Sequence, residues 1–276
     1  MGRDSPRRTL IGVPGERWER GEAYEPYVGR WSRPVAERFV GWLRPEAGER
    51  WLDVGCGTGA LTGAVLADAE PAAVLAVDRS RGYAGHARGL LGEVAGFAVA
   101  DAEWLPVADG SVDLVVSGLR LNFLPDPAAA VAGMRRVCRA GGVVAAYVWD
   151  YAEGMQPIRL FWAAAAGLDP AAAELDEGRR FPLCRPDRLA QLFGAAGLTG
   201  IETEGISVPT RFRNFDDYWT PFLGGQGPAP AYCVGLAEDD RRRLRDRLRS
   251  TLPVAADGSN PLSARAWAVR GTASRD

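Results

Sequence analysis

The chain has 276 residues and a formal net charge of −2, so its charge balance does not suggest a polyanionic partner such as nucleic acid. Its 47% hydrophobic and 25% charged residues are typical of an ordinary soluble globular protein. The length fits one large α/β domain, or one domain with a sizeable insertion.

Cysteine and histidine are sparse, and the chain shows no targeting or membrane-spanning signal. Cys56, Cys138, Cys184 and Cys233 are widely separated, and His86 is the only histidine, so we expect no metal site. The first residues carry charges instead of an apolar run, and the alanine-rich runs are too interrupted to cross a bilayer. We therefore expect a reduced, cytoplasmic protein without a membrane partner.

The chain opens with an arm that we assign to residues 1–33, followed by a helix expected to begin at Pro34. Aromatic and arginine side chains gather at the end of the arm. This cluster either packs against the helix or covers a bound ligand. In the second case Tyr27, Arg30 or Ser32 would reach a carboxylate of that ligand, a group that arginine binds well.

Residues 51–59 predict a strand, a tight turn and the start of a helix. An apolar run ends in Asp53 and is followed by closely spaced glycines, which tolerate the positive φ angles of such a turn. Gly55, Gly57 and Ala60 satisfy the G-x-G-x-x-G/A pattern of dinucleotide-binding proteins. Asp53, however, would repel a diphosphate and suits a cationic ligand. The stretch resembles motif I of the class I S-adenosylmethionine-dependent methyltransferases, whose ligand carries an ammonium and a sulfonium group.

Two more predicted strands end in acids. Asp78, about twenty residues past the glycines, is placed to accept hydrogen bonds from both hydroxyls of a ribose. Asp101 and Ala102 follow the next strand. The carboxylate of Asp101 could accept a hydrogen bond from the amino group of adenine, and the amide of Ala102 could donate one to a ring nitrogen. His86 lies in the middle of the intervening helix, which favours a surface or packing role over a catalytic one.

The resemblance becomes specific over residues 50–150. Residues 105–113 are similar to the "LPF.D.SFD" stretch of methyltransferases of the ubiquinone/menaquinone-biosynthesis type. Residues 118–127 fit the same pattern, as does a helix expected to end at the glycine pair Gly141-Gly142. Ala140 departs from it, because family members usually have proline there.

This resemblance implies a Rossmann-like α/β fold with a seven-stranded, mostly parallel sheet whose last strand is antiparallel and whose two faces carry helices. It implies S-adenosylmethionine as the cofactor, S-adenosylhomocysteine as the product, and in-line transfer of the methyl group to a small-molecule acceptor. The residues expected to bind the cofactor are Tyr27, Arg30, Ser32, Asp53, Gly55, Gly57, Asp78, Arg79, Asp101, Ala102, Glu103 and Ser117.

Beyond the cofactor-binding core we expect two insertions. The core spans residues 34–150 and resumes at 186–208, and the last strand and tail occupy 261–276. The intervening segments, 151–185 and 209–260, are rich in aromatic residues, and we interpret them as a helical cap over a mostly apolar pocket. An extra packing layer or a dimer contact is the alternative. The residues expected to contact the acceptor are Asn122, Phe123, Trp149, Arg180, Tyr218, Trp219 and Phe222.

The catalytic base and the acceptor atom are the least determined features. Asp150 and Tyr151, just after the fifth strand, are the candidate base, and the acceptor atom is left open among O, N, S and C. A nicotinamide-dependent oxidoreductase is disfavoured because the chain has no lysine and one histidine. A catalytically silent protein that binds the cofactor and a partner is the second alternative. The oligomeric state, monomer or homodimer, is not fixed by the sequence.

Overall fold

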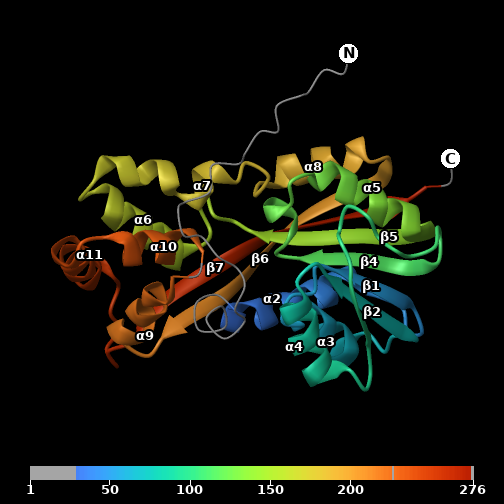
Figure 1. The fold of residues 1–276 in the computed structure, drawn as a ribbon, viewed down its shortest axis with the longest axis horizontal. Coiled ribbons are helices and arrows are strands. Elements are labelled where there is room, and N and C mark those ends of the chain that lie inside the picture. The colour runs from blue at the N-terminus through green and yellow to red at the C-terminus, as the bar shows by residue number, and fades with distance from the viewer. Residues whose placement is uncertain (1–28, 226, 275–276) are drawn as a thin grey trace, which may run out of the picture.

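The computed structural model describes residues 29–225 and 227–274, so the predicted cofactor contact at Tyr27 lies outside the described residues. Its centre is a seven-stranded sheet in the order β3-β2-β1-β4-β5-β7-β6 (Figure 1). Strands β1 to β5 run parallel to one another, whereas β7 is antiparallel to both of its neighbours. This confirms the predicted fold class. The strands are β1 (Arg50–Val54), β2 (Ala73–Asp78), β3 (Gly96–Val99), β4 (Val112–Gly118), β5 (Cys138–Trp149), β6 (Leu198–Phe212) and β7 (Asn260–Ala273).

Helices cover both faces of the sheet because its central strands are buried and apolar on both sides. One face in Figure 1 carries α2 (Arg30–Leu43), α3 (Ala60–Asp68) and α4 (Arg81–Leu91). The other carries α5 (Pro127–Val137) and α8 (Pro186–Ala195). His86 is exposed on α4, as its mid-helix position predicts.

Two helix boundaries differ from those predicted. The helix expected to begin at Pro34 is α2, which begins at Arg30 and has Pro34 inside it. Helix α5 ends at Val137, not at the glycine pair, because the chain enters β5 already at Cys138. A β-bulge between the pairs Val112/Cys138 and Leu114/Val143 accommodates the extra residues, including Gly141 with φ +77°. Pattern alone could not detect this bulge.

Two segments that are distant in the sequence form one helical layer beyond the sheet. The first lies between β5 and α8 and contains α6 (Gln156–Ala166), η3 (Pro170–Leu175) and α7 (Glu177–Arg180). The second, between β6 and β7, contains α9 (Phe215–Trp219), η4 (Thr220–Gly224), α10 (Pro228–Gly235) and α11 (Glu238–Thr251). Phe161 of the first segment stacks on Phe222 of the second with ring centroids 4.5 Å apart. We call this layer the cap (Figure 1).

Candidate active site

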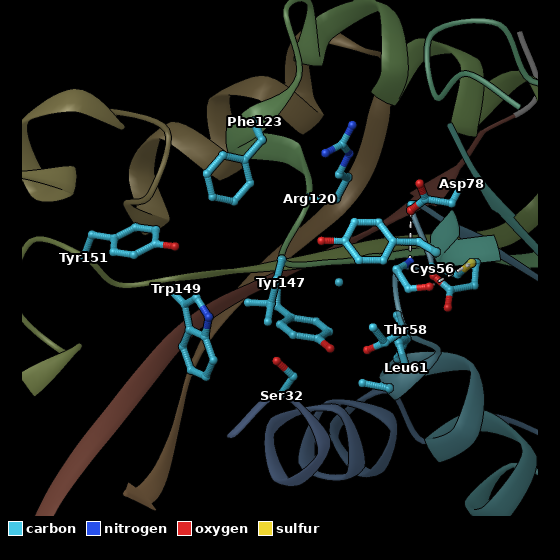
Figure 2. Close-up of a pocket in the computed structure, with 17 residues that line it drawn as sticks. Ser32, Cys56, Thr58, Leu61, Asp78, Arg120, Phe123, Tyr147, Trp149 and Tyr151 are labelled. Atoms are coloured by element: carbon cyan, nitrogen blue, oxygen red, sulfur yellow. Dashed lines mark hydrogen bonds between the residues drawn. The ribbon is translucent and has the colours of Figure 1, made fainter. Parts of the chain in front are cut away.

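A hollow of the described chain opens at the carboxyl ends of the parallel strands, where open α/β sheets bind ligands (Figure 2). It encloses about 850 Å³ of empty space, including its solvent-open mouth. A second hollow adjoins it and shares Gly55, Asp78 and Arg120 in its lining. Of the predicted site residues, the two hollows bring together Ser32, Asp53, Gly55, Gly57, Asp78, Arg79, Asp101, Ala102, Phe123, Trp149 and Tyr151.

The glycine turn forms one wall of the main pocket. Gly55 and Gly57 have φ angles of +79° and +54°, a region that side chains other than glycine rarely adopt. The amide of Gly55 donates to the carbonyl of Val77 at 2.8 Å, and the amide of Gly57 donates to Oδ2 of Asp78 at 3.0 Å. The turn is therefore fastened to the end of β2, with its backbone exposed to the pocket.

The carboxylate of Asp53, in the strand before the glycine turn, also lines the pocket. The residue is almost completely buried, with 1% of its surface exposed. The hydroxyl of Thr62 donates to its Oδ2 at 2.7 Å, but no described residue donates to Oδ1. Burial raises the pKa of Asp53 to about 7, and the nearby Asp78 adds to this effect while the bond from Thr62 opposes it. A buried carboxylate with one oxygen that accepts no hydrogen bond from the described residues fits a ligand that carries a positive charge.

The second hollow contains the remaining strand-end groups. Asp101 and the buried Ala102 line it together with the exposed Arg79. Oδ1 of Asp101 accepts a hydrogen bond from the backbone amide of Glu103 at an N···O distance of 3.1 Å. This bond stabilises the turn after β3. Glu103 is not part of either lining, and its carboxylate accepts a hydrogen bond from the amide of Asp126 at 3.2 Å.

Several predicted ligand-binding side chains make contacts within the protein in this structure. Arg30 forms an ion pair with Asp217 at 3.0 Å, and its guanidinium lies 4.6 Å from the ring centroids of both Trp31 and Phe212. It joins α2 to the cap and does not line the pocket. Ser117 is fully buried, and its hydroxyl donates to the carbonyl of Val54 at 2.7 Å, linking β4 to β1.

Asp150, one of the two candidate bases, accepts hydrogen bonds from residues outside the pocket. Its Oδ2 accepts a bond from Nε of Arg265 at 2.8 Å, and its Oδ1 accepts the amide of Glu153 at 3.0 Å. The residue is 1% exposed and does not line the pocket, so the structure does not place it to remove a proton from an acceptor. Tyr151, the other candidate, does line the pocket.

The predicted acceptor contacts divide between the pocket and the cap. Phe123 and Trp149 line the pocket (Figure 2). Tyr218, Trp219 and Phe222 belong to the aromatic interior of the cap, where the hydroxyl of Tyr218 donates to the carbonyl of Pro157 at 2.8 Å. Asn122 and Arg180 line neither hollow, although the guanidinium of Arg180 lies 5.5 Å from the ring of its neighbour Phe181.

Sequence reasoning missed several pocket residues. Arg120 stands three residues before the predicted Phe123, and Tyr147 lies near the carboxyl end of the fifth strand. The available signal was their position at the carboxyl ends of β4 and β5. The other missed residues of the main lining are Cys56, Thr58, Ala60, Leu61, Tyr83, Gly118 and Leu119.

A doubly wound sheet, a glycine turn fastened to the second strand and three acids at strand ends define a protein that binds a nucleoside ligand with a cationic part. Comparison with known proteins identifies that class. The family model described as "Methyltransferase domain" matches residues 52–146. Malonyl-(acyl-carrier protein) O-methyltransferase of Hahella chejuensis is 40% identical over 227 residues, which cover 74% of this chain and 81% of that protein.

One further relative and one solved structure are similar to this chain. Malonyl-(acyl-carrier protein) O-methyltransferase of Geobacter sulfurreducens is 44% identical over 134 residues, 46% of this chain and 49% of that protein. Phosphoethanolamine N-methyltransferase 2 of Haemonchus contortus, solved with phosphomonomethylethanolamine and S-adenosylhomocysteine, has a TM-score of 0.57 at 17% identity. The match covers 92% of this chain and 57% of that one, and at this identity it shows the fold alone.

The chain belongs to the class I S-adenosylmethionine-dependent methyltransferases, and S-adenosylmethionine is its cofactor. This confirms the family predicted from the motifs and rejects the nicotinamide-dependent alternative. Within the described ranges, no helix combines the length and apolar character needed to cross a membrane. The same ranges hold no cluster of three or more histidine, cysteine, aspartate or glutamate side chains suited to a metal ion.

Proposed function

We propose that this methyltransferase transfers the methyl group to a carboxylate oxygen of a small or carrier-linked acyl acceptor. The observation that carries the proposal is the lining of the pocket. Its described residues include no histidine, lysine or glutamate, and Asp150 is paired with Arg265 outside it. Such a pocket favours an acceptor that arrives already ionised, as a carboxylate does at neutral pH. The malonyl-(acyl-carrier protein) O-methyltransferases among its relatives support this class of acceptor.

The residues of the two hollows fit the cofactor. The free Oδ1 of buried Asp53 suits the ammonium group, and Gly55 and Gly57 allow the ligand to lie against the backbone. Asp78 would accept the ribose hydroxyls, because each carboxylate oxygen has a second lone pair beyond the one used by the protein. Asp101 and Ala102 would hold the adenine. When bound, S-adenosylmethionine supplies an electrophilic methyl group on a sulfonium.

Methyl transfer to a carboxylate needs no proton transfer. The acceptor oxygen attacks the methyl carbon, an oxygen–carbon bond forms while the carbon–sulfur bond breaks, and the electron pair of the broken bond stays on sulfur. The products are a methyl ester and a neutral thioether. The chain therefore contributes orientation and exclusion of water. Tyr147 and Trp149, both nearly fully buried, would supply a dry wall for this step.

The cap would close the acceptor end of the pocket. Phe181, which follows α7 in the first segment of the cap, packs edge-on against Phe123 with centroids 5.1 Å apart and lies 5.7 Å from the ring of Tyr151. This contact joins the cap to two pocket residues. The aromatic rings farther out would then serve mainly to hold the cap together.

The proposal is tested by supplying methyl-labelled S-adenosylmethionine with a panel of acceptors. The panel contains a malonyl thioester, a free dicarboxylic acid, a phenol and a primary amine. We expect label to enter the two carboxylates as an ester that is released by mild base, and the pre-formed methyl ester of the same thioester to accept none. Transfer confined to the phenol or the amine would overturn the carboxylate assignment.

A further inference from the structure

Arg120 is a pocket residue whose position is set by unusual backbone geometry. It is the second residue after β4 and directly precedes the short helix η2 (Leu121–Phe123). The preceding residue, Leu119, has φ +56°, a left-handed conformation that bulky side chains rarely adopt. The amide of Leu119 donates to the carbonyl of Tyr147 at 2.7 Å, which anchors the turn to β5. Strain of this kind persists where the surrounding structure fixes it, often at ligand sites.

The stem of Arg120 lies across the glycine turn. A Cβ atom placed on Gly55 would stand 2.5 Å from Cγ and 3.0 Å from Cβ of Arg120, so only glycine leaves room for this side chain. Arg120 lines both hollows and is drawn between Phe123 and Asp78 in Figure 2. The sequence therefore provides two special positions, Leu119 and Gly55, that hold one arginine in the pocket.

The guanidinium of Arg120 has no partner within the described part of the chain. No described residue accepts a hydrogen bond from it or forms an ion pair with it, although the residue is half-buried. Arg30 and Arg265, by contrast, are both paired with carboxylates. A guanidinium presents a planar fork of donors that matches a carboxylate. Its position in a ligand pocket indicates that the missing partner is an anion of a ligand.

We propose that Arg120 binds the carboxylate of the acceptor, an inference that rests on the proposed function. One carboxylate oxygen pairs with the guanidinium, and the other is left to attack the methyl carbon. Methylation removes the charge, so the ester loses a charge-assisted hydrogen bond that the acid makes. Arg120 therefore selects the acid over its ester and favours release of the product.

The cofactor also carries a carboxylate, but the geometry separates it from Arg120. That group shares a carbon with the ammonium, which the proposed site places at Asp53. Asp53 faces α3, since Thr62 of that helix donates to it. In Figure 2 Thr58, Leu61 and Ser32 lie on the side of α3 and α2, whereas Arg120 and Phe123 lie together on the opposite side.

The test measures binding without turnover, using the complex of the full chain with S-adenosylhomocysteine. A malonyl thioester and its methyl ester are each titrated into the wild-type complex and into those of Arg120→Gln, Arg120→Lys and Arg188→Gln. Arg188 is an exposed residue of α8 and serves as the matched control. We expect the wild type and the control to bind the acid in preference to the ester. Arg120→Gln should bind the acid about 10- to 100-fold more weakly, the usual value of a charge-assisted hydrogen bond.

Cofactor titrations separate the sources of the anion. We expect S-adenosylhomocysteine to bind wild type and Arg120→Gln within about threefold of each other, and Arg120→Lys to recover part of the binding of the acid. If Arg120→Gln instead loses S-adenosylhomocysteine but binds 5′-methylthioadenosine, which lacks the carboxylate, normally, the arginine serves the cofactor and the inference falls. Equal binding of the acid by wild type and Arg120→Gln overturns it as well.

Failure of the proposed function gives a different result. If the wild type binds the cofactor but neither binds nor methylates any carboxylate, the proposed function and the inference fall together. If the wild type methylates carboxylates and Arg120→Gln does so with an unchanged KM, only the inference falls. In steady-state assays the inference predicts that the substitution raises the KM for the acid more than it lowers kcat.

Discussion

The hydroxyl of Thr62 donates a hydrogen bond to Oδ2 of Asp53 at 2.7 Å, while Oδ1 of the same carboxylate has no donor among the described residues. The bond fixes the orientation of the carboxylate, so the free oxygen is held in the pocket. Because the group is buried, its pKa is raised to about 7. The charge that would meet the cofactor's ammonium is therefore sensitive to pH near neutrality.

Cofactor affinity should depend on the ionisation of Asp53. Between pH 5 and 7 the ammonium of the cofactor stays charged, whereas Asp53 takes up a proton below pH about 7. We expect the Kd for S-adenosylmethionine to rise towards tenfold per pH unit on the acid side, measured by calorimetry. Thr62→Val removes a bond that lowers this pKa, so it should move the inflection to higher pH. An identical pH profile in Asp53→Asn would contradict the assignment.

The same shift predicts how the stability of the free protein changes with pH. The folded-state pKa of about 7 exceeds the ordinary value of 3.8, so the folded chain holds the proton of Asp53 more tightly than the unfolded chain does. This stabilisation is complete below pH 3.8 and is lost as the pH rises through about 7. Asp53→Asn cannot ionise. Its free energy of unfolding relative to wild type should increase between pH 4 and 7, by at most about 1.4 kcal/mol per unit, and level off above.

Denaturant titrations of the two ligand-free proteins at a series of pH values check this expectation. When both proteins are saturated with cofactor, their free energies of unfolding should depend on pH in the same way. The bound ammonium then compensates the charge of Asp53 in the wild type. A constant difference between the variants at all pH values would show that the group is not titrating in the folded state.

The cofactor half of the site was predictable from the sequence because its signals are local. Glycines that need a positive φ and acids that end strands keep their meaning without knowledge of the fold. Arg30 and Asp150 were different. Their partners, Asp217 and Arg265, lie 187 and 115 residues away along the chain, and only the fold reveals that these charges are already paired.

The fold was predictable to a similar degree. The family resemblance implied the parallel half and the antiparallel last strand, but not how far β6 and β7 extend. Their pairing runs from Leu198 opposite Ala273 to Phe212 opposite Asn260, so β6 continues into the segment 209–260 that was expected to be cap. Contacts between side chains on the two strands stabilise a long antiparallel pair. The residue pattern of one strand alone does not show these contacts.

Three glycine substitutions should separate backbone strain from loss of space. Gly48, Gly55 and Gly57 all have positive φ, but only Gly55 has a side chain, that of Arg120, against its missing Cβ. Alanine at Gly48, outside the site, should cost about 1–2 kcal/mol of stability from strain alone. Gly57→Ala should cost about the same. Gly55→Ala should cost more, and should also displace Arg120.

Chemical denaturation gives the three stabilities, and titration with S-adenosylhomocysteine gives the three affinities. Gly48→Ala is the control for strain and should retain normal affinity. Equal costs for Gly55→Ala and Gly48→Ala would mean that Arg120 moves away freely, which contradicts a firmly held arginine.

Asp150 should prove structural instead of catalytic. Asp150→Asn weakens the pair with Arg265 that joins the end of β5 to β7, so we expect a loss of roughly 1–3 kcal/mol of stability. The pH profile of kcat, measured where the variant is fully folded, should keep the wild-type shape because no proton passes through this carboxylate. Arg265→Gln should lower stability similarly, and the double variant should cost less than the sum. Loss of the acidic limb of the profile in Asp150→Asn alone would restore Asp150 as a base.

Arg30 and Asp217 provide the last test. The sequence predicts that Arg30 binds the cofactor carboxylate, whereas the structure pairs it with Asp217, and the two roles predict opposite effects on cofactor binding. If Arg30 reached the cofactor carboxylate, Arg30→Met would weaken cofactor binding while Asp217→Asn would leave it intact. The structure pairs the two side chains at 3.0 Å and places the guanidinium 4.6 Å from the ring centroids of both Trp31 and Phe212. We therefore expect both variants to lose about 1 kcal/mol of stability and to bind S-adenosylmethionine within about twofold of wild type. The pair joins α2 to the cap, so hydrogen exchange should increase in α9 in both variants. A selective loss of cofactor affinity in Arg30→Met would show that Arg30 leaves Asp217 when the ligand binds.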